Sequence, residues 1–376
     1  MTGIPDHYQT DEEADVKRSL SIVQALTVAL VLATGACATT NGSEGGGNNV
    51  ASGQLRLESG LTPVDPAKVK KSLVVGVDNP HYIFSEDVVV AEEKGYFDEV
   101  GIEDVTIKVL DEPIPGLIGG SLDLVAADTD AIFSAAQQSR SNLRYLGVNF
   151  GKEFIGLGVM AGIDTTDDLV GTKIGAGQAN SRTDFNLRQL LTENGVDLDD
   201  LKVVNSGGTA NDRLAAVLAG TMDGASLQIR HRKFLEDVGG KFLLEKTQAV
   251  PQSGWAADQL LVDSPETVAA FLAAVLKARA YIVNPSHQDE VIELMEAADY
   301  EIPAEYVAAY ADENAPDYHT VDAGFEVGDM DTFVADSIKF ETAPVGTKWR
   351  ELTDLLPLWQ AQKELGIPLR PAPSDL

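Results

Sequence analysis

A glycine turn followed by a polar helix start is the clearest candidate binding element in this chain of 376 residues. Gly175 and Gly177 begin the turn as a dinucleotide-binding motif does, but the third glycine of that motif is missing. Ser181 and Asp184 fit a helix capping box, and Arg182 lies between them. The first N–H groups of a helix have no partner within it and can bind an anion. The pattern predicts an anion site, with helix capping by Ser181 as the structural alternative.

Polar residues after the other predicted strands complete the candidate binding site. In open α/β sheets a ligand lies beyond the carboxyl ends of the strands, and that rule selects residues after four strands. Arg182 is the best partner for an anionic head group, since a guanidinium binds a carboxylate or sulfonate bidentately; a solvated surface arginine is the alternative. Trp255 either stacks on the ligand or packs in the hinge, at the start of a predicted strand that returns from the second half of the folded part to the first. The expected ligand-binding residues are Asn79, His81, Tyr82, Asp128, Thr129, Gln178, Asn180, Ser181, Arg182, Gln228, Arg230 and Trp255.

Signatures of catalysis and of metal binding are absent from the sequence. The chain has no His-Glu-x-x-His, P-loop or Gly-x-Ser-x-Gly motif. A single cysteine allows neither an intrachain disulfide nor a thiolate metal site. We expect His231 to be a solvated helix residue rather than a ligand. The histidines, which are far apart in sequence, are His7, His81, His231, His287 and His319. We therefore predict a protein that is not an enzyme and that needs no cofactor or metal.

The charge balance excludes two classes of partner. Asp and Glu total 59 against 28 Lys and Arg, which gives a formal net charge of −31. Binding to nucleic acid needs a basic surface, and an acidic protein body is repelled by anionic lipid. We expect neither a nucleic-acid partner nor a folded part that lies on a membrane surface.

The N-terminal segment, residues 1–36, has the order of a secretory signal peptide. Lys17 and Arg18 precede an apolar stretch at 20–32 that is too short for a comfortable transmembrane helix. Small residues then lead to Cys37. This order resembles the lipobox of bacterial lipoproteins, although Thr34 stands where that motif usually has leucine. The resemblance implies that Cys37 is acylated and anchors the mature protein to the outer, extracytoplasmic face of the cell membrane; a small buried cysteine is the alternative.

Two further N-terminal segments are expected to lie outside the folded part. Residues 1–15 carry five acidic side chains, which is unusual ahead of a signal sequence. Because a valine codon can start translation in bacteria, we hypothesise that synthesis begins at Val16. Residues 38–53 are rich in Gly, Ser and Asn and predict a flexible tether with a reach of roughly 20–25 Å. We expect residues 37–70 to link the lipid to the folded part.

The order of predicted elements in the folded part occurs twice. Strands are predicted at 72–78, 105–110, 124–128, 173–177, 201–205 and 224–228, and helices at 88–95, 114–119, 184–194 and 212–219. The turn residues correspond in pairs: Gly76 with Gly175, Gly95 with Gly195, Gly120 with Gly220, and Asp123 with Asp223. A glycine that closes a helix can take the left-handed conformation of a C-cap. Two βαβαβ units predict two α/β lobes, each built on a mostly parallel sheet.

Segments between and after the two units are expected to join the lobes. Strands at 142–148 and 157–160 are predicted to cross to the second lobe, and a strand at 254–262 to return. Ser264 and Pro265 then open the first helix of a tail that we expect to pack on the first lobe. Tail helices are predicted at 267–282, 287–299, 303–313, 330–340 and 348–364. The expected division is 1–36 signal peptide, 37–70 linker, 71–159 first lobe, 160–253 second lobe, and 254–376 return and C-terminal helices.

A set of short motifs, taken in order, resembles a known family. The motifs lie at 74–77, 91–102, 119–123, 166–175 and 191–204, of which Ala-Glu-Glu-Lys-Gly-Tyr-Phe-Asp-Glu-Val-Gly-Ile at 91–102 is the strongest. Together they resemble the solute-binding proteins of ABC importers in the nitrate, sulfonate, taurine and thiamine-pyrimidine-precursor group, over residues 71–300. The resemblance implies the two-lobed type II periplasmic-binding-protein-like α/β fold, each lobe a mostly parallel sheet flanked by helices. The two lobes would close on one small solute and present it to a cognate permease.

The solute class and two other functions stay open at this point. The turn at 175–182 favours a small organic anion, a sulfonate or a carboxylate, whereas Asp128 would suit the amino group of a pyrimidine or a zwitterion. Pyrimidine synthases of the same fold group carry a cysteine-rich motif that this chain lacks. A sensory lipoprotein of this fold would use a receptor domain as its partner instead of a permease.

Overall fold

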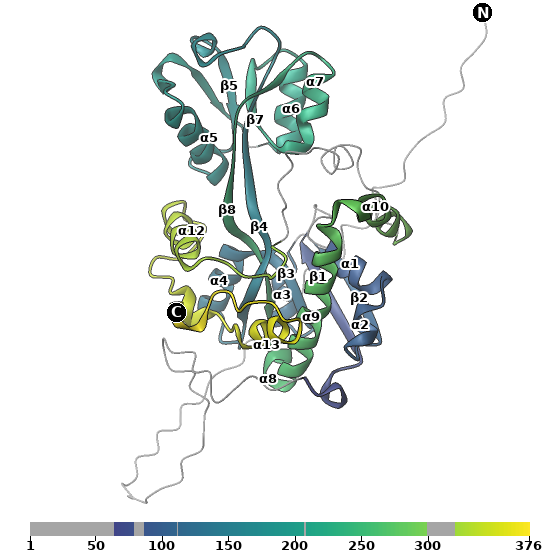
Figure 1. The fold of residues 1–376 in the computed structure, drawn as a ribbon. Helices are drawn as coiled ribbons and strands as arrows, with labels where there is room; N and C mark the ends of the chain where they lie inside the picture. Colours follow the sequence, from purple (N-terminus) through teal and green to yellow (C-terminus); the bar gives the residue numbers. More distant parts are fainter. Residues whose placement is uncertain (1–63, 79–85, 111, 207, 299–319) are drawn as a thin grey trace, which may run out of the picture. The chain divides into compact units, whose positions relative to one another are not determined.

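The computed structural model describes residues 64–78, 86–110, 112–206, 208–298 and 320–376 (Figure 1). The predicted signal peptide, Cys37, the tether at 38–53 and the helix expected at 303–313 lie outside these residues, as do Asn79, His81 and Tyr82. Among the described helices, none has both the length and the apolar composition needed to span a lipid bilayer.

One mixed sheet of eight strands runs through the described chain in the order β2-β1-β3-β8-β4-β7-β5-β6. Each of its two ends is a parallel three-stranded unit, as the duplicated pattern predicted. The first lobe holds β1 (Ser72–Asp78), β2 (Asp104–Leu110) and β3 (Leu124–Asp128), and the second lobe holds β5 (Lys173–Ala176), β6 (Lys202–Asn205) and β7 (Gly224–Leu227). The two-lobed α/β architecture is thereby confirmed.

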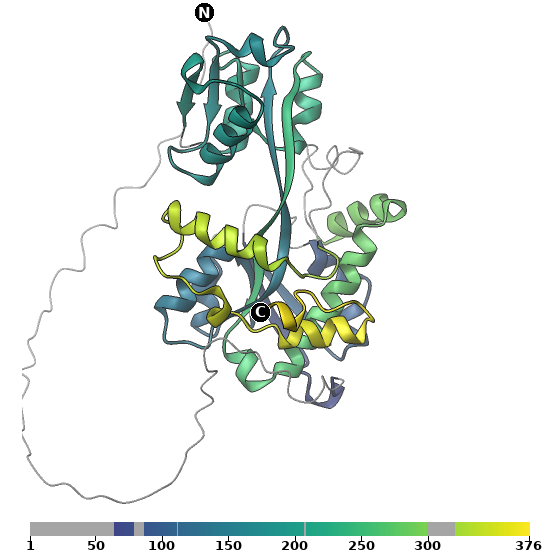
Figure 2. The ribbon, with the colours of Figure 1, turned by 60° about the vertical axis from the view of Figure 1, so that its left-hand side comes forward.

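Two long antiparallel strands, β4 (Arg144–Val159) and β8 (Lys241–Ala257), join the two units (Figures 1 and 2). β8 pairs with β3 on one side, and β4 pairs with β7 on the other. The two separate strands expected at 142–148 and 157–160 are in fact one strand, because its middle stays paired with β8 through several register shifts. The strand expected at 254–262 is also wrong beyond Ala257, since residues 259–263 form a helix.

Helices cover the sheet and form the C-terminal tail. They are α1 (Glu86–Glu93), α2 (Tyr96–Glu99), α3 (Ile114–Ile118), α4 (Thr129–Gln138), α5 (Arg182–Glu193), α6 (Ala210–Leu218), α7 (Arg232–Glu236), α8 (Gln259–Asp263), α9 (Pro265–Ile282), α10 (Gln288–Ala297), α12 (Val327–Lys339) and α13 (Leu356–Glu364). The single helix expected at 348–364 is instead a short 3-10 turn, 349–352, followed by α13. Pro357 explains the break, because proline has no N–H to continue a helix and is tolerated only in its first turn.

The predicted turn glycines have the conformation that the duplication requires. Gly95 and Gly195 have φ of +70° and +79°, and Gly120 and Gly220 have φ of +75° and +68°. Residues with side chains rarely adopt this left-handed region, which explains glycine at all four turns.

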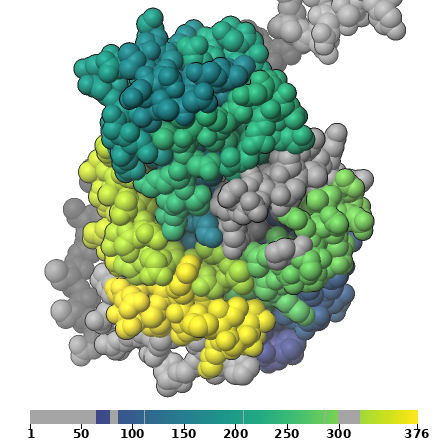
Figure 3. Space-filling view, turned by 45° about the horizontal axis from the view of Figure 1, so that its top comes forward, coloured from purple at the N-terminus to yellow at the C-terminus, as the bar shows by residue number. Residues whose placement is uncertain are grey.

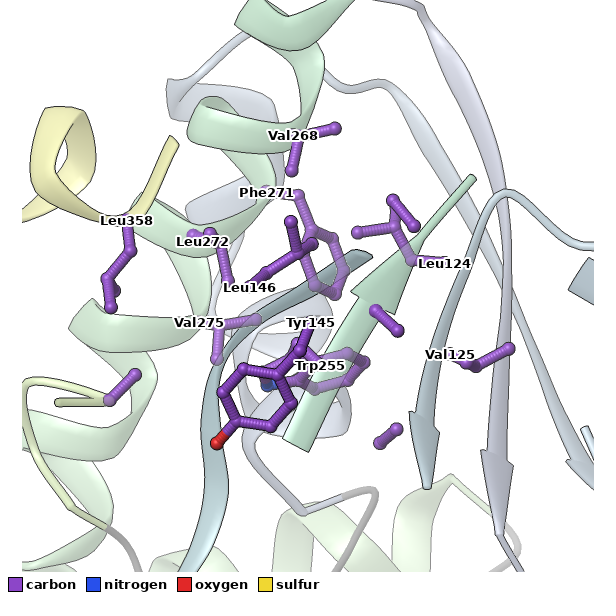
Figure 4. Packing of buried hydrophobic residues seen from close by; sticks show 14 of the residues in the cluster. Leu124, Val125, Tyr145, Leu146, Trp255, Val268, Phe271, Leu272, Val275 and Leu358 are labelled. Atoms are coloured by element: carbon purple, nitrogen blue, oxygen red, sulfur yellow. The ribbon is translucent and has the colours of Figure 1, made fainter. Parts of the chain in front are cut away.

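The larger apolar core lies in the first lobe and includes buried side chains of the tail helices (Figure 4). The Ala- and Leu-rich helix α9 is buried along most of its length, as expected for a helix that is apolar on nearly all sides. Its Phe271 and Leu272 pack with Tyr145 of β4 and Trp255 of β8. The second lobe has a smaller core, to which strands β4 and β5 and helix α5 all contribute.

Candidate functional site

The turn that leads into α5 has the capping geometry predicted from the sequence. Ser181 is the N-cap, and its Oγ accepts a hydrogen bond from Asp184 N at 3.3 Å. The Asp184 carboxylate in turn accepts from Asn180 N at 3.2 Å. Asn180 has φ of +63°, an uncommon conformation that asparagine tolerates better than most residues. Gln178 and Asn180 are exposed, so this turn presents polar groups at the carboxyl end of β5.

Arg182 contacts helix α12 of the C-terminal tail. Its Nη2 donates to Ser337 Oγ at 3.0 Å, and its guanidinium carbon lies 4.4 Å from the centroid of the Phe333 ring. In Figure 3 the yellow-green surface that includes α12 adjoins the teal surface of the second lobe. The solvated surface arginine considered as the alternative is therefore excluded. Contact with an anion, the other role considered from the sequence, remains a prediction.

His231, in the 3-10 turn after β7, is a buried neutral group. Its Nδ1 accepts from Gln228 N at 3.3 Å, so Nε2 carries the proton and donates to Asn211 Oδ1 at 2.9 Å. Burial, followed by the charges of Arg230 and Arg213, lowers the pKa of His231 to about 3. The expectation of a solvated helix residue is wrong, because the side chain is only 1% exposed.

Basic residues gather around this histidine at the carboxyl end of β7. Arg230 Nη2 also donates to Asn211 Oδ1, at 3.5 Å. Arg213 of α6 is buried and donates to the backbone oxygens Ser226 O at 2.9 Å and Gly208 O at 3.0 Å. Burial lowers the pKa of Arg213, and the nearby Arg230 charge lowers it further, against the opposing effect of Asp212.

The first lobe presents two buried hydroxyl groups at the carboxyl end of β3. Thr129 begins α4, directly after the predicted site residue Asp128, and it is 0% exposed. Ser253 of β8 is the register partner of Asp128 and is 1% exposed. Within the described part of the chain Ser253 Oγ has no hydrogen-bond partner, whereas the Thr129 hydroxyl interacts with that of Tyr145 and so partly offsets the rise in the Tyr145 pKa that burial causes. Since most buried polar groups in native proteins are paired, Ser253 is a candidate ligand contact. Ser253 was missed because β8 begins at Lys241, well before the strand predicted at 254–262.

A buried ion pair supports the strand β4 beside this site. Arg279 Nε of α9 donates to Asp87 Oδ2 at 2.7 Å, and both side chains are fully buried. Arg279 also donates to Val148 O and to Asn149 Oδ1, at 2.7 and 2.9 Å. The arginine therefore fixes α1 to β4 where that strand leaves the first lobe. A charged residue on a buried helix face is the signal that would have found Arg279, and equally Arg213, which shares a face of α6 with Ala210 and Val217.

Trp255 is placed in the core of the first lobe. It is 0% exposed, and its ring meets Phe271 edge-on with centroids 5.0 Å apart (Figure 4). This is the packing alternative considered from the sequence. The described candidates thus fall into two groups, Asp128 and Thr129 on the first lobe, and Gln178, Asn180, Ser181, Arg182, Gln228 and Arg230 on the second.

Comparison with known proteins identifies relatives of this arrangement. The family model described as NMT1/THI5 like matches residues 85–288. The periplasmic aliphatic sulphonate binding protein SsuA from Escherichia coli is 19% identical with a TM-score of 0.54, covering 76% of this chain and 97% of that one. The periplasmic nitrate-binding protein NrtA from Synechocystis is 14% identical with a TM-score of 0.55, covering 81% and 92%.

An enzyme also has this fold. The desulfurization enzyme DSZB is 14% identical with a TM-score of 0.54, covering 79% of this chain and 100% of that one. A search of curated protein sequences gave no match. At these identities the structural likeness shows the fold alone, which is the two-lobed periplasmic-binding-protein-like fold predicted from the sequence motifs.

Proposed function

This chain belongs to the NMT1/THI5-like family, and from that premise we propose that it is the extracytoplasmic solute-binding component of an ABC importer that captures a small organic anion. The fold supports the role, since periplasmic binding proteins for sulfonate and nitrate share it. Long strands between two lobes suit hinge closure around a solute. The anion would be a sulfonate or a carboxylate.

The observation that carries the proposal is the unpaired hydroxyl of Ser253, which is buried opposite Asp128 at the carboxyl end of β3. Leaving a buried polar group unpaired costs about 1–3 kcal/mol. Such a group at a strand end, beside the buried Thr129, is best explained as a donor to a bound ligand. An oxygen of a sulfonate or carboxylate can accept this hydrogen bond.

The charges at the carboxyl ends of β5 and β7 support an anion over a cation. Arg182 and Arg230 follow these two strand ends, respectively. The N-terminus of α5 adds the positive end of a helix dipole at the same edge. Positive charge at this edge of the sheet favours a negatively charged solute.

A thermal-shift screen of the protein against sulfonates, aromatic acids, nitrate and pyrimidines tests the proposal. A ligand at about 100 times its dissociation constant adds about 2.7 kcal/mol of stability. Ser253→Ala should weaken binding of the anionic hit about tenfold, the value of one hydrogen bond to a charged group. Ser134→Ala is the matched control, because that hydroxyl of α4 donates to Thr342 O. Stabilisation by pyrimidines alone would show the pyrimidine alternative to be correct.

We propose further that the protein does not catalyse a reaction on its solute. The enzyme DSZB shows that the fold itself permits catalysis. The supporting observation is that the sequence lacks the catalytic motifs sought, and its single cysteine is Cys37. Conversion of a thermal-shift hit into product by the purified protein would overturn this proposal.

Attachment to the membrane through lipid on Cys37 is the remaining part of the proposal, supported by the lipobox-like sequence at 34–37. Cys37→Ser should release the protein from the membrane into the medium, because the acyl chains would no longer be attached. Fractionation of cells that express each form measures this. Stable membrane retention of the variant would contradict lipid anchoring.

A further inference from the structure

Helix α5 of the second lobe and helix α12 of the tail meet through a partly buried hydrogen bond. Arg182 Nη2 donates to Ser337 Oγ at 3.0 Å, and Ser337 is fully buried. The Ser337 hydroxyl itself donates to Phe333 O at 2.8 Å, which leaves its oxygen to accept from Arg182. The serine is therefore oriented by its own helix to receive the guanidinium.

Aromatic rings extend this contact on both sides of Arg182. The guanidinium carbon lies 4.4 Å from the centroid of the Phe333 ring and 5.9 Å from that of Phe340. The Phe340 ring in turn lies 5.1 Å from the ring of Phe185 on α5. Lys339 Nζ is 3.9 Å from the centroid of Phe185. Side chains of the two helices thus alternate in one stack of cations and rings.

The stack joins the two lobes, because its two helices belong to different cores. Phe333 and Met330 of α12 are part of the core of the first lobe. Leu187 and Leu191 of α5 are part of the core of the second lobe. The contact therefore links the lobes at a place separate from the strands β4 and β8.

We propose that Arg182, Phe185, Ser337 and Phe340 form a latch that holds the lobes in the arrangement of this structure and so sets how easily they move before a solute binds. The planar guanidinium suits the role, because it stacks on rings and donates a directed hydrogen bond together. Lysine in its place would keep the charge and lose the planar group that packs against a ring. The latch also connects movement of the lobes to the candidate binding turn, since Arg182 directly follows the N-cap Ser181.

The test measures the distance between the lobes without solute. Two dyes are attached to the full-length Cys37→Ser protein through Lys108→Cys on the first lobe and Lys202→Cys on the second, both at exposed positions. Single-molecule energy transfer then gives the distance distribution. Arg182→Ala and Phe340→Ala should each move the equilibrium away from the latched distance about tenfold or more, with Arg182→Lys in between. Arg188→Ala is the matched control, since that arginine of α5 pairs with Asp184 in its own lobe.

The two single variants should not be additive if they break the same stack, so the double variant should resemble either one. Cooperative thermal unfolding of each variant confirms that it is folded. An unchanged distance distribution in solute-free Arg182→Ala and Phe340→Ala would overturn the latch. Because no solute is present, this outcome is independent of whether the protein binds an anion.

Discussion

In both βαβαβ units an aspartate at the turn before the third strand makes the same two hydrogen bonds to the first strand. In the first lobe Asp123 N donates to Val74 O at 2.7 Å, and Asp123 Oδ2 accepts from Val74 N at 2.9 Å. In the second lobe Asp223 makes the same two bonds to Lys173, at 2.9 and 2.7 Å. Each aspartate thus fixes the start of the third strand to the first strand. The repeated positions hold the scaffold.

The units differ at the helix that follows their first strand. α1 begins beside the buried Asp87, whose charge is neutralised by Arg279 of α9. α5 begins with the Ser181 cap and with Arg182, which reaches α12 of the other lobe. The ion pair of the first lobe is buried inside that lobe, whereas Arg182 of the second lobe contacts α12, which packs on the first lobe. Positions where the units diverge are therefore those at which binding and motion should be sought.

Removing Arg279 from its buried pair with Asp87 should cause the largest loss of stability. The loss tests whether the folding of the first lobe depends on this ion pair. Arg279→Ala leaves Asp87 buried without its partner, and breaking such a pair costs about 3–5 kcal/mol. Arg188→Ala removes a partly exposed arginine from the second lobe and should cost about 1 kcal/mol or less. Urea unfolding followed by fluorescence reports the first lobe, because Trp255, Trp349 and Trp359 all lie in its core. Equal losses of unfolding free energy in Arg279→Ala and Arg188→Ala would show that the buried pair matters no more to stability than the partly exposed one.

The stability of the protein should depend on pH through His231 of the second lobe. Its pKa of about 3 in the folded protein is below the ordinary value of 6.5, so the unfolded chain binds a proton that the folded chain does not. Its contribution to stability is therefore present above pH 6.5 and is lost as the pH falls toward 3, by about 1.4 kcal/mol per pH unit within that window.

His231→Gln should remove this contribution, so its stability should fall less than that of the wild type between pH 7 and pH 5. Urea unfolding followed by circular dichroism at several pH values measures the slope. His287→Gln controls for loss of a histidine from the first lobe. Identical pH slopes for the wild type and His231→Gln would contradict a buried neutral imidazole.

The fold was predictable from sequence where its determinants are local. Turn glycines impose a backbone conformation within a few residues, and they indicated the duplication correctly. Strand β4 was predicted in two pieces because Gly151, Lys152 and Glu153 interrupt its apolar pattern, while its continuity depends on pairing with the distant β8.

The site was less predictable, because many of its contacts join residues that are far apart in the sequence. Capping by Ser181 involves residues three apart and was foreseen. Arg213 and Arg279 stand out as charged residues on buried helix faces, but the groups that they bond to belong to other elements and are not indicated by the neighbouring sequence. The contact of Arg182 with Ser337 spans 155 residues, so the arginine was recognised as a candidate but its neighbour was not.

Alanine at the equivalent glycines Gly76 and Gly175 should give the smallest difference in stability between changes in the two lobes. A Cβ on Gly76 would lie 2.6 Å from Leu122 Cδ1, with Pro113 Cβ and Val125 Cγ1 at 3.1 and 3.2 Å. Gly76→Ala should therefore cost about 1–3 kcal/mol through overpacking, since these neighbours surround the new methyl group.

The same change in the second lobe should cost less. A Cβ on Gly175 would collide with Met222 Sδ and lie 3.2 Å from Ala225 Cβ, but an unbranched thioether can move aside more readily than a packed leucine. We expect Gly76→Ala to exceed Gly175→Ala by about 1 kcal/mol in urea unfolding followed by circular dichroism. Gly328→Ala, in the open first turn of α12, is the control and should be neutral or slightly stabilising. A larger loss for Gly175→Ala would mean that Met222 is held as rigidly as Leu122, and that the smaller core of the second lobe is as tightly packed as the first.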